Sequence, residues 1–106
     1  MIMFFSPDCD HCQRQTKELL AYKKELKDLQ IVMVSVLSYK DSKTFYNEYG
    51  LAGMPNIKLG TDPTYKLRQI YKLQTMPAMY VYDKNGTLAK AFVGNIDVPR
   101  IIDAVK

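Results

Sequence analysis

Two apolar runs on either side of a long charged stretch most constrain the fold of this chain. Residues 1–5 (MIMFF) and 31–36 (IVMVSV) have the length of strands and lack the alternation of a half-solvated strand. Such runs are typical of parallel strands that are buried on both faces of a sheet. Parallel neighbours need a crossover connection, so the residues between the runs are predicted to form a helix.

The stretch between the two runs has the spacing of an amphipathic helix. Residues 9–29 are rich in Lys, Glu, Leu and Ala, and their apolar positions recur at intervals of three and four. This face comprises Thr16, Leu19, Leu20, Leu26 and Leu29. Because Lys23 falls in the middle of the face, either its stem extends outward or the helix changes phase there. The first third of the chain is thus predicted to be a right-handed βαβ unit.

The middle of the chain is predicted to be mainly helical and irregular. A short helix is expected over residues 42–49, with Gly50 in the position that ends it. Residues 53–60 (GMPNIKLG) are interpreted as a loop that can include a short extended piece. A further helix is predicted to begin at DPTYKLRQIY, where Asp62 suits the N-cap and Pro63 the first helical position.

The last part of the chain has the pattern of a hairpin followed by a helix. Two strand-like runs, AMYVYD and TLAKAFVG, flank Asn85-Gly86, which is a strong signal for a tight turn between antiparallel strands. The final segment, DVPRIIDAVK, begins with Asp97 as a candidate N-cap and repeats apolar residues at helical spacing. The predicted order is βαβ, an interposed helical segment, and then ββα.

Length and charge limit the class of protein. A chain of 106 residues can build its own core, so one domain over residues 1–106 is expected. The net charge of +4 comes from scattered lysines and not from a basic stripe interleaved with aromatic residues, so no nucleic-acid partner is expected. No apolar run approaches the roughly 20 residues that span a bilayer, and MIMFFSPDC lacks the features of a signal peptide. We therefore expect no membrane contact by this segment.

Two cysteines separated by two residues are the candidate chemical site. Cys9 and Cys12 fall on the turn from the first predicted strand into the first predicted helix. The free amides at a helix N-terminus favour a thiolate at Cys9, and Cys12 lies one turn on, close enough for a small disulfide ring. A thiolate at Cys9 can attack the disulfide of a partner, and Cys12 can then resolve the mixed disulfide. This chemistry needs no cofactor.

The residues around the cysteines are expected to tune the pair. His11 can place a positive charge or an N–H donor near the Cys9 sulfur, which stabilises the reduced form. Asp8 and Asp10 act in the opposite direction, and the sequence leaves the sign of the net effect open.

Two other interpretations of the cysteines remain at this point. A structural zinc site needs four ligands, and the chain has no third cysteine and no second histidine, so no intrachain metal site is expected, whereas an intermolecular one stays open. The cysteines can also be two small buried residues at the start of a helix, an interpretation that leaves their spacing unexplained.

Taken together, the motifs resemble the thioredoxin superfamily. They are the apolar strand followed by Cys9-Asp10-His11-Cys12, the βαβ plus ββα order, and TMPAMYVYDKNG before the last hairpin. The FFSPDCDHC start and the Pro, strand, Asp-x-x-Gly, strand finish are most similar to the TlpA-like thiol-disulfide oxidoreductases. The resemblance implies an α/β thioredoxin fold, with a central mixed sheet flanked by helices and without the usual N-terminal strand and helix.

The resemblance also implies roles for particular residues. Cys9 is the expected nucleophile, Cys12 the resolving thiol and His11 the tuning residue. In the family a cis proline before a strand faces the cysteines, and the backbone of the preceding residue pairs with an incoming peptide. Pro77 and Met76 match these positions, so they are the expected substrate-binding residues. The alternative for Pro77 is a trans proline at the start of a strand.

Several positions depart from the patterns of related families. Thioredoxins carry a buried acid six residues before the first cysteine, and some TlpA-like members carry one six residues after it; these places hold Met3 and Gln15. Lys17 stands where the family has a helix proline. For the peroxiredoxins of the same fold, Ser6 fits the hydroxyl position, but Ile2 replaces the proline, so peroxidase activity is not expected.

The resemblance sets the remaining expectations. The expected partners are proteins with thiols or disulfides, the expected state is a monomer, and the expected location is extracytoplasmic, either periplasmic or membrane-tethered. Because the first strand would be central in the sheet yet begins the chain, we expect a protein truncated at its N-terminus. The alternative function is a non-catalytic thioredoxin-like binding module that uses the groove around Met76 and Pro77, and the absent acids favour it.

Overall fold

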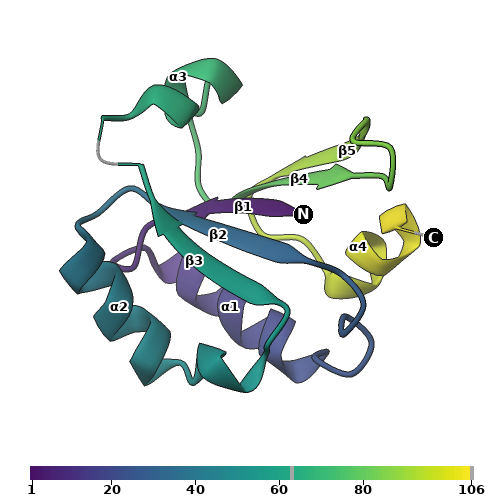
Figure 1. The fold of residues 1–106 in the computed structure, drawn as a ribbon, viewed down its shortest axis with the longest axis horizontal. Coiled ribbons are helices and arrows are strands. Elements are labelled where there is room, and N and C mark those ends of the chain that lie inside the picture. Colours follow the sequence, from purple (N-terminus) through teal and green to yellow (C-terminus); the bar gives the residue numbers. More distant parts are fainter. Residues whose placement is uncertain (63, 106) are drawn as a thin grey trace.

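A mixed sheet of five strands forms the centre of the protein, in a computed structural model that describes residues 1–62 and 64–105. The strands are β1 (Ile2–Phe5), β2 (Ile31–Ser35), β3 (Ile57–Thr61), β4 (Ala78–Tyr82) and β5 (Leu88–Val93). Their order across the sheet is β3-β2-β1-β4-β5 (Figure 1). The first three strands are parallel to one another, and β4 and β5 are antiparallel to their neighbours.

The helices cover the two faces of the sheet unequally. Figure 1 shows α1 (Asp10–Ala21), α2 (Tyr39–Glu48) and α4 (Val98–Val105) on one face and α3 (Lys66–Tyr71) on the other. The main core lies between the sheet and the helices α1, α2 and α4. It contains Met3, Phe5, Cys12, Leu19, Met33, Phe45, Met79, Phe92, Val98 and Ile101 among its buried side chains. None of the helices within the described ranges is long and apolar enough to cross a membrane.

The opposite face is held by aromatic residues. Phe4 of β1 is fully buried there, with its ring centroid 5.1 Å from that of Tyr71 at the end of α3. The rings of Tyr71 and Tyr80 lie 4.5 Å apart, and the Tyr71 hydroxyl shares a hydrogen bond of 2.6 Å with the Tyr82 hydroxyl. This cluster fixes the end of α3 a few residues before Met76.

The predicted βαβ unit and terminal hairpin are confirmed. In β1, Met3, Phe4 and Phe5 are fully buried, as expected of a central strand. The turn between β4 and β5 contains Gly86 with a φ of 81°, a conformation that favours glycine. The helix α4 begins directly after the predicted N-cap, Asp97.

The first predicted helix is shorter than its pattern indicates. It ends at Ala21, and residues 22–28 form turns, although Leu26 still reaches the core and is only 1% exposed. Lys23 therefore follows the helix and does not interrupt it. The apolar spacing in the sequence continues past the end of α1, because a turn segment can bury leucines as well as a helix can.

The short extended piece that was allowed within residues 53–60 is a paired strand of the sheet. This segment leads from a short 3-10 helix (Leu51–Gly53) into the edge strand β3, in which Ile57 is buried and pairs with Ile31 of β2. Gly60 and the exposed Lys58 made the run too weak to predict a strand. The neighbouring strand supplies the hydrogen bonds that the local sequence does not predict.

The two middle helices differ from the predicted ones at their starts. The helix α2 begins at Tyr39, because Ser38 is its N-cap and accepts a hydrogen bond from the Asp41 amide. The helix α3 begins at Lys66, four residues after the predicted N-cap. Asp62 nevertheless accepts hydrogen bonds from the amides of Leu67 and Arg68, so it caps the helix from a distance. The predicted first helical residue, Pro63, lies outside the described residues.

Candidate redox site

Cys9 occupies the N-cap position of α1. Its backbone is extended, with φ −97° and ψ 119°, and the Cys9 amide donates to the Ser6 carbonyl at 3.1 Å, which closes the turn after β1. The Cys9 carbonyl accepts the first bond of the helix, from the Gln13 amide at 2.9 Å. The thiol is partly exposed and free. A partly exposed cysteine with a free thiol thus stands at the positive end of a helix.

Cys12 is the buried member of the pair. It lies in the first turn of α1, is fully buried, and is also a free thiol. Burial raises the pKa of Cys12 to about 12, because a thiolate would lose its hydration there; the neighbouring Cys9 and Asp8 act in the same direction, and a hydrogen bond with the Ser6 backbone opposes them. The two cysteines therefore differ in both access and acidity.

Met76 lies directly beside the Cys9 sulfur. The Cys9 Sγ donates to the Met76 carbonyl at 3.9 Å, and the peptide bond between Met76 and Pro77 is cis. Pro77 is buried and stands just before β4, and its carbonyl accepts a hydrogen bond of 2.8 Å from the Gly94 amide. The structure thus brings the two predicted substrate-binding residues and the predicted nucleophile to one end of the sheet.

His11 has a partner that the sequence did not indicate. Its Nδ1 lies 3.0 Å from the Oδ1 of Asn95, and the Nδ2 of Asn95 donates to the His11 carbonyl at 2.7 Å. Asn95 belongs to the loop between β5 and α4, which crosses beside α1. The printed sequence gives no signal for this contact, since a loop asparagine is ordinary in any protein.

Gln15, in the place of the acid of some relatives, is a structural residue here. It is 1% exposed, its Nε2 donates to the Ile96 carbonyl at 3.1 Å, and its Oε1 accepts from the Ile96 amide at 2.8 Å. Both of its polar groups are therefore occupied by the backbone of the loop. A polar residue on the buried face of a helix was the available signal for this role.

Two further positions from the family patterns, Lys17 and Ser6, have simple structural roles. The helix α1 runs without interruption from Asp10 to Ala21 through the exposed Lys17. The Ser6 hydroxyl donates to the Asp8 carboxylate within the turn before Cys9.

Within the described ranges, His, Cys, Asp and Glu side chains do not gather in the groups of three or more that a metal site requires.

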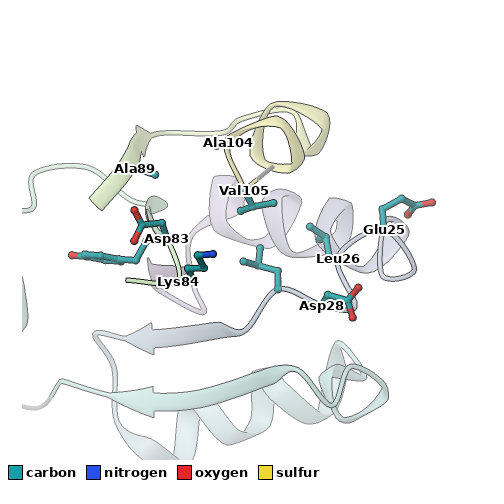
Figure 2. A pocket seen from close by; sticks show the side chains of 10 residues that line it. Glu25, Leu26, Asp28, Asp83, Lys84, Ala89, Ala104 and Val105 are labelled. Carbon is teal, nitrogen blue, oxygen red and sulfur yellow. The ribbon is translucent and has the colours of Figure 1, made fainter. Parts of the chain in front are cut away.

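A cavity of about 520 Å³ lies at the end of the sheet away from the cysteines. Figure 2 shows the apolar Leu26 and Val105 beside the charged Asp83 and Lys84 around it. Because β4 runs antiparallel to β1, the end of β4 that lines this cavity is opposite the end where Cys9 lies. A smaller groove of about 390 Å³ does adjoin the site, between Asp8 in the turn before Cys9 and Phe45 of α2.

Comparison with known sequences gives a family match over the whole chain and two relatives that match over a short segment. The family described as "Thioredoxin-like domain" matches residues 1–106. Protein disulfide-isomerase A6 of Mus musculus is 34% identical over 59 residues, and the protein of the same name from Mesocricetus auratus matches to the same extent. These matches cover 56% of this chain but only 13% of either relative.

Solved structures of thiol-disulfide proteins share the fold. A putative thiol:disulfide interchange protein DsbE from Chlorobium tepidum superimposes with a TM-score of 0.77 at 20% identity, over 99% of this chain and 78% of that one. A secreted Mycobacterium tuberculosis disulfide oxidoreductase homologous to DsbE gives 0.79 at 16% identity, over 97% and 76%. A putative thioredoxin from Neisseria meningitidis gives 0.79 at 20% identity, over 96% and 68%.

These findings confirm the predicted α/β thioredoxin fold and the resemblance on which it rested. The solved structures share the mixed sheet flanked by helices. The matched proteins include ones named as a protein disulfide-isomerase, a thiol:disulfide interchange protein and a disulfide oxidoreductase. Because the family match extends over the whole sequence, the chain belongs to the thioredoxin-like domain family.

Proposed function

We propose that this protein is a thiol-disulfide oxidoreductase that exchanges a Cys9–Cys12 disulfide with protein thiols. The observation that carries the proposal is the asymmetry of the pair: Cys9 is accessible at a helix N-terminus, whereas Cys12 is fully buried one turn later. A nucleophile must be reached by the partner, and a resolving thiol need only reach the nucleophile.

The proposed exchange has two steps, in which every bond that forms replaces one that breaks. The Cys9 thiolate attacks one sulfur of a partner disulfide, so that a Cys9–partner bond forms and the partner S–S bond breaks; the released partner thiolate takes up a proton. Cys12 then loses its proton and attacks the Cys9 sulfur, which forms the Cys9–Cys12 disulfide and releases the second partner thiol. Two electrons pass to the partner, and the reverse sequence oxidises a dithiol.

The proton of Cys12 controls the second step. With the pKa of Cys12 raised to about 12, the thiolate is scarce near neutral pH. Met3 cannot accept the proton, and the amide of Gln15 is already bonded to Ile96. The proton therefore goes to water or to the departing partner thiolate. This step is expected to limit the rate at which the mixed disulfide is resolved.

The backbone of Met76 is the proposed docking point for the partner. Its carbonyl accepts from the Cys9 Sγ in the free protein, so a peptide that brings a cysteine to Cys9 arrives beside the same backbone. His11 is proposed to tune the pair. We propose a monomer, and a location outside the cytoplasm by analogy with the secreted protein of Mycobacterium tuberculosis.

A binding module without turnover is the second candidate. It is supported by the lack of an acidic proton acceptor at Met3 and Gln15, which stand in the two positions where relatives carry one.

Trapping of the mixed disulfide separates the two candidates. Cys12→Ser is mixed with a peptide that contains one disulfide, and the products are examined by mass spectrometry without reductant. An oxidoreductase forms a covalent adduct at Cys9 that a reductant reverses, and Cys9→Ser forms none. Peptide binding without an adduct would contradict the proposed exchange and support the binding module.

A further inference from the structure

Asn95 contacts the redox motif through both ends of its side-chain amide. Its Nδ2 donates to the His11 carbonyl at 2.7 Å, and its Oδ1 lies 3.0 Å from the Nδ1 of His11. The two residues are 84 positions apart, and His11 is the single histidine of the chain. A loop residue therefore holds both the backbone and the ring of a residue that lies between the two cysteines.

These two bonds determine where the proton of the ring lies. A backbone carbonyl can only accept, so the amide atom that faces it must be the NH2 group. The other amide atom is then the oxygen, which also can only accept. The His11 Nδ1 must therefore carry a hydrogen, in the neutral ring as well as in the charged one. In the neutral ring, Nε2 is left without a hydrogen and is the atom that gains the proton.

The loop that carries Asn95 is fixed on both sides. Before it, the Gly94 amide donates to the Pro77 carbonyl at 2.8 Å, and after it, the Ile96 backbone makes two hydrogen bonds with the buried Gln15. Asn95 thus lies on a segment that is bonded both to Pro77, the residue after the proposed docking point, and to α1. The side chain of Asn95 is itself exposed, but the bonds of its two neighbours fix the backbone from which its amide extends.

We propose that Asn95 is a positioning residue for the redox pair, which holds the His11 ring in one orientation and one tautomer beside the Cys9–Cys12 turn. This inference rests on the proposed function. An imidazole N–H held in one orientation between the two cysteines can stabilise the reduced form, and this effect weakens when the ring is free to rotate into solvent. The charged residues that line the cavity beside Asn95 are Arg14, Glu18 and Asp97, and they are unchanged in the variants below.

A double-mutant cycle tests the inference. The equilibrium constant between the Cys9–Cys12 disulfide and glutathione is measured by alkylation and mass spectrometry for the wild type, Asn95→Ala, His11→Ala and the double variant. Each single variant is expected to make the disulfide about threefold harder to reduce. The double variant is expected to equal His11→Ala, because Asn95 acts through the ring. An unchanged constant in Asn95→Ala, or effects that add in the double variant, would overturn the proposal.

The nitrogen spectrum of the His11 imidazole reports its tautomer directly. Replacing Asn95 would not change this spectrum if Asn95 only stabilised the fold. In neutral wild-type protein, a 15N–1H correlation should show a protonated Nδ1 and a bare Nε2. Asn95→Ala removes both contacts with His11 and should lose this tautomer. A ring protonated at Nε2 in the wild type would refute the geometry. If the wild type shows no redox transition, the proposed function fails, while this spectrum still decides whether Asn95 orients the ring.

Discussion

The Sγ of Cys9 lies 3.9 Å from the carbonyl oxygen of Met76, although 67 positions separate the two residues in the chain. The antiparallel pairing of β1 with β4 brings them together, because Phe4 stands opposite Ala78 and both chain segments leave the sheet at the same end. The proposed nucleophile and the proposed docking backbone are therefore set by the register of two central strands. A partner peptide needs no rearrangement of the sheet to reach both.

The two cysteines should differ strongly in their reaction with alkylating agents. Cys9 is accessible, whereas Cys12 is fully buried and its pKa is raised to about 12, so Cys12 offers little thiolate at pH 8. Iodoacetamide should modify Cys9 at least about tenfold faster than Cys12 in the native, reduced protein. Peptide mapping at short times measures the ratio, and the difference should vanish in urea. Equal rates in the native protein would contradict the asymmetry.

The stability of the reduced protein should fall at alkaline pH because of Cys12. The unfolded chain loses the Cys12 proton near its ordinary pKa of 9.0, whereas the folded protein keeps it until about pH 12. Between these values the folded state binds the extra proton, so the free energy of unfolding decreases as the pH rises, by up to about 1.4 kcal/mol per pH unit. Urea unfolding under reducing conditions measures this slope. Cys12→Ser is the control and should have a smaller slope by this amount.

Gln15 should contribute to stability and not to proton transfer. Gln15→Ala leaves the amide and carbonyl of Ile96 without partners, with an expected loss of about 2 kcal/mol. In Gln15→Glu, one oxygen would face the Ile96 carbonyl, so the buried carboxyl is expected to keep its proton, with a raised pKa. The stability of this variant should therefore fall as the pH rises above about 4.3, the value for the unfolded chain. A Gln15→Glu stability that does not depend on pH would argue against the bonded geometry.

Asp62 should stabilise α3 through its carboxylate. Its two oxygens accept from the amides of Leu67 and Arg68, and the residue is 5% exposed. Asp62→Ala should cost about 1 kcal/mol, as the loss of a helix cap does. Asp62→Asn keeps one accepting oxygen and should recover part of that stability. Thermal unfolding of the three proteins gives the comparison, and equal midpoints would show that the cap contributes nothing.

Much of the fold could be predicted because it depends on local patterns. The buried runs of β1 and β2, the Asn-Gly turn and the apolar face of α4 each specify their own structure. The strand β3 could not be predicted, because Ile57 acquires its strand conformation by pairing with Ile31 of β2. The distant cap by Asp62 has the same origin, since it depends on a path of the chain that follows from tertiary packing.

The candidate site was likewise predicted only in part from the sequence. The spacing of Cys9 and Cys12 and the motif around Pro77 carried a strong signal in the sequence. The partners of His11 and Gln15 carried almost none, because Asn95 and Ile96 lie in a loop about 80 residues away and are ordinary residues there. Hydrogen bonds between distant segments leave no periodic trace in the sequence, so they had to be found in the structure.

A redox titration of the purified protein in glutathione buffers tests the central claim most directly. The Cys9–Cys12 disulfide is quantified at each potential by alkylation and mass spectrometry. We expect one reversible two-electron transition between about −120 and −270 mV, the range of the thioredoxin-fold oxidoreductases. Both thiols reacting independently, with no disulfide at any potential, would contradict the account.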